Sequence, residues 1–313
     1  MTNSEVIQVS LSVIQQMRMQ YENNIITKVP QGGIFIAKLP SCTITAYKSG
    51  KVLFQGSDAK SESSRWVKDA TVAPKNSKKK SETTSFSPPP AIGTMSIIGS
   101  DEVGTGDYFG PITVVATYVE SSQIPLLKEL GVRDSKDLND EQITAIAKQL
   151  IPFLPYSLLV LPNEKYNALQ ANGTNQGEMK AKLHNQAITN VRKKIAPKQP
   201  EAILIDQFVK PDIYYNYLRK QKTIQRELVY FATKGEQIHI AVAAASIIAR
   251  YAFVKHMNEL GTKAGFIIPK GAGSKVDQAA AKLIKTRGKE SLTQFVKLHF
   301  ANTEKAMRIA AKS

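Results

Sequence analysis

The chain has 313 residues, 42% of them hydrophobic, and this length and composition suit one or two domains with buried cores and exclude a wholly disordered protein. Its 42 Lys and Arg residues against 26 Asp and Glu residues give a formal net charge of +16, which favours polyanionic partners such as nucleic acid or an acidic membrane face. No run of 18 apolar residues and no signal-peptide pattern occur, so we expect a cytoplasmic protein that does not enter a membrane.

The first 70 residues have the pattern of a small α+β domain. A short apolar alternation starts at Val6, and a helical stripe follows with Val13, Met17 and Tyr21 on one face. A closing helix is predicted from residue 59 to residue 70. Between the two helices we predict three strands, over residues 33–39, 42–48 and 51–55, with Ser49-Gly50 as a two-residue hairpin turn.

These predicted strands mix lysine and aromatic side chains. The residues in question are Lys38, Lys48, Lys51, Phe35, Tyr47 and Phe54. A nucleic-acid-binding sheet uses such a mixture for phosphate contact and stacking, but alternate residues of any half-buried strand look similar, so both interpretations stay open. The single cysteine, Cys42, is expected to pack in one strand, and its inability to form an internal disulfide agrees with a reducing compartment.

Residues 71–92 differ in composition from the rest of the chain. They are rich in Lys, Ser, Thr, Asn and Pro, and include the runs Lys78-Lys79-Lys80 and Pro88-Pro89-Pro90. This composition predicts a flexible linker, either a solvated tether or a segment that also contacts phosphates. We therefore expect a first domain over residues 1–70 and a second over residues 93–313.

The second domain alternates predicted strands and helices. Strands are expected over residues 96–100, 112–119, 202–205 and 228–233. Helices are expected over residues 139–150, where Asn139 and Gln142 have capping spacing, over 179–195, and over the Ala-rich stretch 241–257. Strands mixed with long helices indicate an α/β sandwich.

Carboxylates follow two of the apolar strands. Asp101 and Glu102 come directly after residues 97–100, and Asp206 comes directly after residues 202–205. Carboxylates held together at a buried strand end repel one another unless a cation compensates, so the pattern indicates a metal site. Oxygen ligands without cysteine favour Mg²⁺ or Mn²⁺. Glu236 is a fourth candidate ligand, although a Glu near a helix start is often a macrodipole partner, and Asp206 could equally cap a turn.

The segment after the carboxylate pair is a glycine-rich loop. Residues 104–111 contain three glycines and a proline, and such a loop could present backbone groups to a sugar-phosphate chain or simply form a tight turn. Its spacing is not that of a dinucleotide-binding fingerprint, and residues 271–275 lack the Walker spacing. The four histidines are expected to be ordinary surface or core residues, since none has ligand spacing to another; they are His184, His239, His256 and His299.

The string Gly-Ser-Asp-Glu-Val-Gly-Thr-Gly-Asp-Tyr-Phe-Gly-Pro at residues 99–111 resembles the opening motif of the bacterial ribonuclease HIII family. Further matches follow in the family's order at residues 133–138, 203–206, 233–236 and 243–250. Thr105 and Glu236 stand where the wider type 2 family usually has Arg and Asp, which looks like the type 3 branch. The stretch 42–56 is similar to the TATA-binding-protein-like domain that precedes the catalytic domain in that branch.

This resemblance implies an RNase H-like fold behind a TATA-binding-protein-like domain. It implies an endonuclease that hydrolyses the RNA strand of RNA/DNA hybrids by two-metal-ion catalysis and leaves 3′-hydroxyl and 5′-phosphate ends. The implied catalytic and metal-binding residues are Asp101, Glu102, Asp206 and Glu236, with Mg²⁺ or Mn²⁺ as the cofactor.

The resemblance also implies how substrate is recognised. The backbone of Gly104, Thr105 and Gly106 would read the ribose 2′-hydroxyl, and Lys136 and Lys270 would contact phosphate or sugar, unless they are ordinary solvated lysines. We expect a monomer. The competing hypothesis is a basic nucleic-acid-binding protein whose carboxylates are structural.

Overall fold

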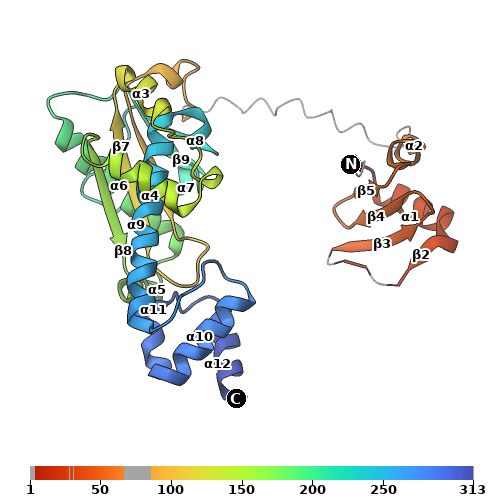
Figure 1. Cartoon of the computed structure of the whole chain (residues 1–313). Helices are drawn as coiled ribbons and strands as arrows, with labels where there is room; N and C mark the ends of the chain where they lie inside the picture. Colours follow the sequence, from red (N-terminus) through yellow and green to blue (C-terminus); the bar gives the residue numbers. More distant parts are fainter. Residues whose placement is uncertain (1–3, 28, 31, 67–85, 313) are drawn as a thin grey trace. The chain divides into compact units, whose positions relative to one another are not determined.

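The computed structural model describes residues 4–27, 29–30, 32–66 and 86–312, which form two compact units, Met1–Thr83 and Thr84–Ser313 (Figure 1). Residues 71–85 of the predicted linker lie outside the described residues. The end of that predicted linker packs on the second unit: the ring of Phe86 contacts those of Tyr215 and Phe231, and its carbonyl accepts a hydrogen bond of 2.9 Å from the Phe231 amide. The packed chain of the second unit thus begins before residue 93.

The first unit has a five-stranded antiparallel sheet in the order β1-β5-β4-β3-β2. Its strands are β1 (Ser4–Gln8), β2 (Ile25–Ile26), β3 (Gly33–Lys38), β4 (Thr43–Tyr47) and β5 (Lys51–Gln55), and its helices are α1 (Leu11–Gln20), a 3₁₀ turn (Glu22–Asn24) and α2 (Ala59–Ser64). The three predicted strands are present. The two-residue β2 has too few residues to show an alternation. Residues 67–70 of the predicted closing helix lie outside the described residues.

One face of this sheet packs on α1. Val13, Met17 and Tyr21 are buried against Phe35 and Phe54, as the helical stripe predicts. Burial raises the pKa of Tyr21 to about 12, and its hydroxyl donates to Glu62 at 2.9 Å.

The opposite face carries a row of side chains that crosses all five strands. The register aligns Val6, Leu53, Thr45, Ile36 and Ile26 from β1 to β2. Four of the five are apolar, and Val6 is 59% exposed. This face therefore differs from the solvated, polar face that such a sheet usually presents.

The second unit has a mixed five-stranded sheet in the order β10-β9-β6-β7-β8. Its strands are β6 (Ile97–Val103), β7 (Ile112–Val119), β8 (Tyr156–Leu161), β9 (Ala202–Asp206) and β10 (Val229–Ala232). Strands β6, β9 and β10 run parallel, whereas β7 and β8 are antiparallel to their neighbours. Strand β6 extends three residues beyond the predicted residue 100, so Asp101 and Glu102 lie within it and pair with β7.

Helices cover both faces of this sheet, as predicted for an α/β sandwich. Helices α4 (Asp140–Leu150) and α9 (Ile240–Ala264) cover one face, and α6 (Gln176–Ile195) and α7 (Pro211–Leu218) cover the other. Gly99 allows the close approach of α9, because a Cβ there would lie 2.3 Å from the Val242 nitrogen. Asn139 and Gln142 form the predicted capping box at the start of α4. Helix α9 has the length and apolar composition of a membrane span, but 67% of its most apolar window is buried in this unit, as in a core helix.

The C-terminal helices form a further packed group beside the end of α9 (Figure 1). They are α10 (Ser274–Arg287), a 3₁₀ turn (Lys289–Ser291), α11 (Leu292–Phe295) and α12 (Asn302–Ala311). Their apolar residues pack on Tyr108, Phe109 and Phe253. The shorter elements of the second unit are Ile92–Thr94, Ser121–Gln123, α3 (Ile124–Glu129), Ser135–Asp137, α5 (Asn163–Ala171) and α8 (Gly235–Ile238).

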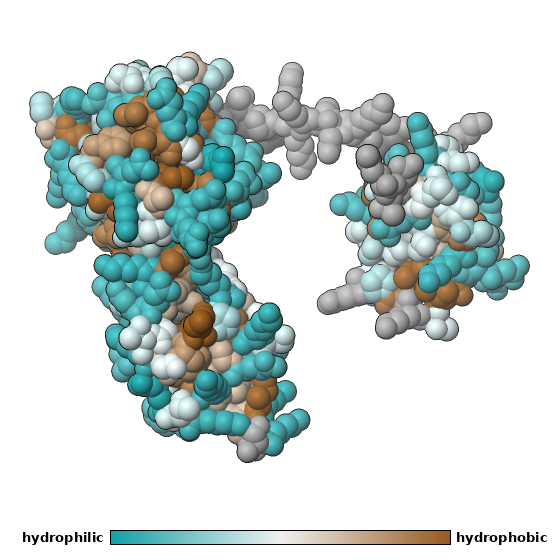
Figure 2. All heavy atoms as spheres, viewed as in Figure 1, coloured by the Kyte–Doolittle hydropathy of each residue, from teal (hydrophilic) through white to brown (hydrophobic). Residues whose placement is uncertain are grey.

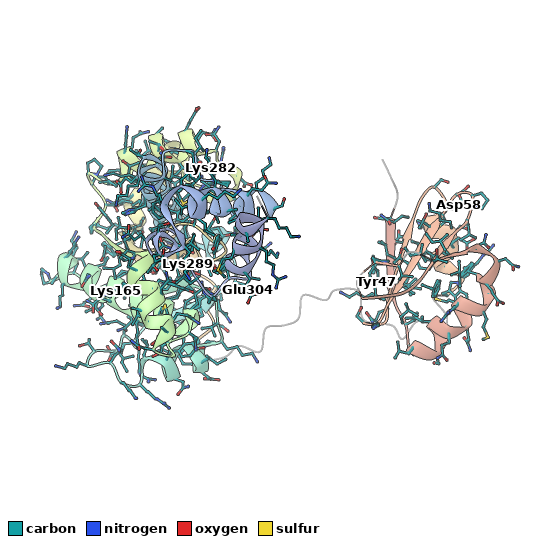
Figure 3. All side chains as sticks on the ribbon, turned by 90° about the horizontal axis from the view of Figure 1, so that it is seen from below. Tyr47, Asp58, Lys165, Lys282, Lys289 and Glu304 are labelled. Carbon is teal, nitrogen blue, oxygen red and sulfur yellow. The ribbon has the colours of Figure 1, made fainter. Side chains whose placement is uncertain are left out.

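Hydrophilic residues predominate over the visible surface of each unit (Figure 2). Lys282 on α10 and Lys289 beyond it are exposed, and Figure 3 marks both on the C-terminal helices.

Candidate active site

The four predicted carboxylates lie near the carboxyl ends of the three parallel strands. Asp101 and Glu102 are in β6, Asp206 ends β9, and Glu236 lies in α8, shortly after β10. The register of β6 and β9 pairs Ser100 with Ile205, so Asp101 and Asp206 are the next residues on adjacent strands. Since neighbouring strands are about 4.8 Å apart, the sheet brings these two side chains together.

Asp101 and Asp206 face α9. They alternate with Ile97 and Leu204, which pack in the core beneath that helix. Among the described residues, neither carboxylate forms an ion pair with a basic side chain. Burial raises the pKa of Asp101 well above its usual value, and the nearby Glu102 and Asp206 raise it further. Burial also raises the pKa of Asp206, although the Gly235 amide donates to its Oδ1 at 2.8 Å.

Glu102 points to the other face, because successive residues of a strand alternate. Its Oε1 accepts from Lys180 Nζ at 2.7 Å, and its Oε2 accepts from His184 Nε2 at 2.9 Å. Both partners come from α6, four residues apart, so they share one side of the helix. Burial by itself would raise the pKa of Glu102, but His184 and Lys180 together lower it.

His184 is a core residue, one of the two expectations from the sequence, but the sequence did not indicate its contact with Glu102. It is fully buried, its Nδ1 lies 2.7 Å from the Ser100 hydroxyl, and its ring stacks on Phe208. Lys180 lies over the same Phe208 ring at 4.1 Å. Sequence reasoning missed Lys180 altogether; the one available signal was its four-residue spacing from His184 within a predicted helix.

Glu236 pairs with Lys136 at 3.2 Å. The Glu236 side chain is 4% exposed and that of Lys136 is 78% exposed, so the lysine reaches the acidic edge from solvent. Burial would lower the pKa of Lys136, but the hydrogen bond and charge of Glu236 raise it. The structure thus places the predicted Lys136 beside the carboxylates.

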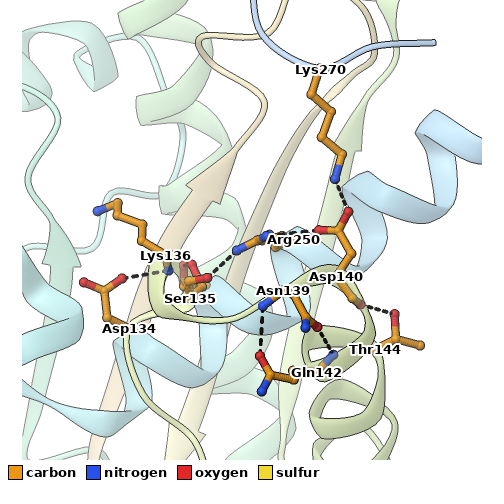
Figure 4. Close-up of polar contacts among 10 residues, drawn as sticks. Asp134, Ser135, Lys136, Asn139, Asp140, Gln142, Thr144, Arg250 and Lys270 are labelled. Carbon is orange, nitrogen blue, oxygen red and sulfur yellow. Dashed lines mark hydrogen bonds and ion pairs between the residues drawn. The ribbon is translucent and has the colours of Figure 1, made fainter.

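Lys270 lies elsewhere, in a network with Asp140 and Arg250 (Figure 4). Its ammonium pairs with Asp140, which also accepts from Arg250 at 3.0 Å, and Arg250 donates to the Ser135 carbonyl. The Ser135 hydroxyl lies 2.9 Å from that of Ser246 on α9. Lys270 is therefore linked to the turn that carries Lys136 by way of Asp140 and Arg250, and it does not contact a carboxylate of the sheet edge.

The glycine loop follows β6. Gly104 has φ of +96°, and a Cβ there would lie 2.2 Å from the Pro111 carbonyl oxygen, so only glycine fits. Apart from Gly106 itself and its two chain neighbours, no described residue has an atom within 4 Å of the position that a Cβ would take at Gly106. The Thr105 carbonyl accepts from Gln176 at 3.2 Å, whereas its buried hydroxyl has no partner among the described residues. The loop is thus packed closely at Gly104 and open at Gly106.

The donors at this sheet edge suit a hard divalent cation. Within the described ranges, no three His, Cys, Asp or Glu side chains are grouped so as to hold a metal ion, because Glu102 turns to α6 and Glu236 turns to Lys136. Two carboxylates nevertheless have raised pKa values and no basic partner there, and the other two share the edge with them. Uncompensated carboxylate oxygens without thiols are the ligands that Mg²⁺ and Mn²⁺ prefer.

Comparisons with known proteins cover both units. The family described as Ribonuclease HII matches residues 98–303, and a domain of unknown function (DUF3378) matches residues 4–79. The Ribonuclease HIII of Bacillus cereus (strain 03BB102) is 66% identical over 310 residues, 99% of each chain. The crystal structure of Bst-RNase HIII in complex with Mn²⁺ is 44% identical, with a TM-score of 0.71 over 99% of this chain and 100% of that chain. The ribonuclease H2 from Pyrococcus horikoshii OT3, 22% identical with a TM-score of 0.55 over 70% of this chain and 100% of that chain, shares the fold.

Proposed function

Since this chain belongs to the ribonuclease HIII family and is a hydrolase of the ribonuclease H class, we propose that it cuts the RNA strand of RNA/DNA hybrids internally. The products are a 3′-hydroxyl and a 5′-phosphate end. The observation that carries the proposal is the edge where Asp101 and Asp206 meet on parallel strands, with raised pKa values and no ion pair to a described basic side chain. The substrate is a polyanion, which the net charge of +16 attracts.

Asp101, Glu102, Asp206 and Glu236 are the proposed catalytic and metal-binding residues, with Mg²⁺ or Mn²⁺ as the cofactor. The donor chemistry supports this assignment, as does the relative Bst-RNase HIII, whose crystal structure is a complex with Mn²⁺. When bound, two divalent ions polarise the attacking water and stabilise the departing 3′-oxygen.

The neighbouring side chains have roles of their own. Lys180 and His184 keep Glu102 ionised, so its oxygens remain available as acceptors at neutral pH. Lys136, which is 78% exposed next to Glu236, can pass from the carboxylate to a substrate phosphate. Lys270 supports that lysine through Asp140 and Arg250 rather than by touching substrate.

The glycine loop is the proposed reader of ribose. The backbone of Gly104, Thr105 and Gly106 begins two residues after Glu102, so a strand bound with its scissile phosphate at the carboxylates runs past the loop. Open space at Gly106 admits a sugar, and a 2′-hydroxyl can both donate to and accept from backbone groups.

The first unit, residues 1–70 in the proposed division, supplies additional hybrid binding through its outer sheet face. The support is the row from Val6 to Ile26, with Lys38 and Lys51 exposed on β3 and β5. In the division predicted from the sequence, residues 71–92 join it to the catalytic domain, residues 93–313, although the chain from Phe86 onward already packs on the second unit. Deleting residues 1–70 should raise KM for the hybrid far more than it lowers kcat, and steady-state kinetics of the two proteins checks this.

One panel of substrates tests the proposed function. Matched RNA/DNA, RNA/RNA and DNA/DNA duplexes are incubated with Mg²⁺, with Mn²⁺ or with chelator. Internal cuts in the RNA of the hybrid alone, dependent on metal, are expected. Cutting of DNA/DNA at a similar rate, or cutting in chelator, would overturn the proposal. The enzyme is further proposed to act as a cytoplasmic monomer that does not enter membranes, which its mass in solution and its location in the cell would test.

A further inference from the structure

Lys297 is fully buried, although lysine side chains usually lie at the protein surface. It lies between α11 and α12 with no exposed area, and no described carboxylate forms an ion pair with it. Its Nζ donates to the carbonyl oxygens of Asp107 at 2.7 Å and Gly110 at 2.6 Å. Burying an amine so completely is costly, and a leucine or methionine would fill the same space without that cost.

The Lys297 amine has enough hydrogens to donate to both of its carbonyl partners. Burial lowers its pKa to about 7, although the Asp107 charge opposes this. The ammonium has three hydrogens and the neutral amine has two, so in either state the group can donate to both carbonyls. The Tyr166 ring, 5.9 Å from Nζ, lies on a further side of the group.

Both carbonyls belong to the glycine loop, and the backbone around Lys297 holds the same loop. The Lys297 amide donates to the Tyr108 carbonyl at 2.9 Å, and the Gly110 amide donates to the Phe295 carbonyl at 2.9 Å. Phe109 and Val296 form an isolated antiparallel bridge between these two backbone contacts. The C-terminal segment therefore lies along the loop as an added strand would.

The loop is rigid on one side of Asp107 and open on the other. Residues 107–110 are fixed by Lys297, and the Gly110 carbonyl also accepts from Asn163 at 2.9 Å. At residues 105–106 the contacts are fewer: Gln176 reaches the Thr105 carbonyl, and nothing described approaches Gly106. Fixing the closed half restricts the directions in which the open half presents its N–H and C=O groups.

We propose that Lys297 is a positioning residue for ribose recognition: by holding the Asp107 and Gly110 carbonyls, it aims the backbone of Gly104, Thr105 and Gly106 at the 2′-hydroxyl. This inference rests on the proposed function and deepens it, because it makes selectivity for RNA depend on the C-terminal segment. A loop that already has its binding conformation before substrate arrives loses less conformational entropy on binding. A displacement of about 1 Å in its backbone groups can lower the reaction rate about 100-fold.

The test compares Lys297→Met with Lys305→Met in the full-length enzyme. Methionine keeps most of the volume and removes the donor; Lys305 is exposed on α12, so its substitution removes one surface charge from the same segment. For each protein, KM and kcat on an RNA/DNA hybrid are measured with Mg²⁺, and a DNA/DNA duplex of the same sequence is used as a competitive inhibitor. The ratio of the duplex Ki to the hybrid KM expresses the preference for ribose.

K297M should lower this ratio about tenfold or more by raising the hybrid KM while the duplex Ki stays unchanged. K305M should move Ki and KM together, because losing a surface charge weakens both polyanions alike. An unchanged ratio in a folded K297M enzyme would overturn the positioning role. If wild-type enzyme fails to cut the hybrid at all, the proposed function falls instead.

A second variant covers the case in which K297M does not fold. Lys297→Gln keeps an N–H₂ donor at a shorter reach, and its ratio should lie between those of wild type and complete loss of preference. A wild-type ratio in K297Q together with wild-type thermal stability would show that the donor position is irrelevant, and this too would overturn the proposal.

Discussion

Two carboxylates that are neighbours in the sequence lie on opposite faces of one strand and have opposite environments. Glu102 meets Lys180 and His184 from α6, and its pKa is lowered. Asp101 meets Asp206 and α9 without a described basic partner, and burial and its acidic neighbours raise its pKa. The described side chains thus neutralise the carboxylate on one face and leave those on the other face without an ion pair, which is where we propose that cations bind.

We call the side of the sheet that Glu102 faces the α6 face and the side that Asp101 and Asp206 face the α9 face. We propose that the α6 face contributes to stability and that the α9 face binds metal. Breaking a buried ion pair leaves an uncompensated charge, so the α6 face contributes stability only as long as all its members are present. The carboxylates of the α9 face repel each other, which lowers the stability of the fold unless a bound ligand compensates for the repulsion. Variants that remove a carboxylate from the α9 face, or a basic partner from the α6 face, test whether the two faces differ in this way.

The largest expected effect comes from Asp101→Asn. It removes a proposed metal ligand, so hybrid cleavage should fall about 10³-fold or more, while hybrid binding in chelator stays near wild type. The unfolding temperature in chelator should rise, because a carboxylate with a raised pKa is gone. Single-turnover cleavage, hybrid titration and thermal unfolding measure the three quantities.

The matched control is Asp212→Asn on α7, an exposed carboxylate whose loss changes the net charge equally. It should leave cleavage within about twofold of wild type. Near-native cleavage by D101N would remove Asp101 from the catalytic site.

Lys180→Met leaves the buried carboxylate of the α6 face without its lysine partner, so this face comes to resemble the α9 face. Glu102 would remain buried beside His184 with half of its partners, and the second unit should lose about 3–5 kcal/mol of unfolding free energy. Lys182→Met on the same helix is the control: it removes a partly exposed partner of Glu178 and should cost about 0.5 kcal/mol. Equal losses in the two variants, measured by denaturant unfolding, would mean that the buried pair is no more important than a surface one.

Adding metal should stabilise the second unit and leave the first unit alone. With Mn²⁺ at about 100 times its Kd, the second unit should gain about 2.7 kcal/mol. The single tryptophan, Trp66, is buried in the first unit, so its fluorescence reports that unit, and calorimetry reports both. A Mn²⁺-dependent shift in the Trp66 transition, or an equal gain in D101N, would contradict binding at this sheet edge.

Part of this site follows from local sequence, and part does not. Asp101 and Asp206 are predictable because an apolar run of buried strand precedes each one, and parallel strands end at the same edge. Glu102 follows from the same strand end as Asp101, and the family motif supports Glu236, which its position alone indicates only weakly. What local pattern missed was the continuation of β6 through Val103, which turns Asp101 and Glu102 to different faces.

The partners of these residues depend on tertiary contacts between distant segments. Lys180 lies 78 residues from Glu102, and only the packing of α6 on the sheet decides which side of that helix meets the carboxylate. Lysines are usually exposed, so nothing local marks Lys297 as buried or Lys270 as paired with Asp140. Composition indicated a basic protein with a linker between two parts of the chain, but the packing of Phe86 on the second unit needed the structure.

A pH titration extends the comparison to the two buried histidines. His184, on the α6 face, meets a carboxylate, whereas His239, at the start of α9, meets only backbone: Nε2 lies 3.1 Å from the Met95 carbonyl, and Nδ1 accepts from the Ala241 amide at 2.9 Å. A proton on Nδ1 would break the cap of α9, and burial accordingly lowers the pKa of His239 to about 4.

Because the unfolded chain binds this proton near pH 6.5, His239 should reduce stability progressively as the pH falls from 6.5 toward 4, and have no such effect above that window. Between pH 7 and pH 5.5 the second unit should lose about 1 kcal/mol relative to His239→Asn, which keeps a capping acceptor without titrating. Taking the difference between the two proteins cancels Asp101 and Asp206, whose raised pKa values act in the opposite direction. Parallel stability curves for wild type and H239N would mean that the cap of α9 does not depend on a neutral imidazole.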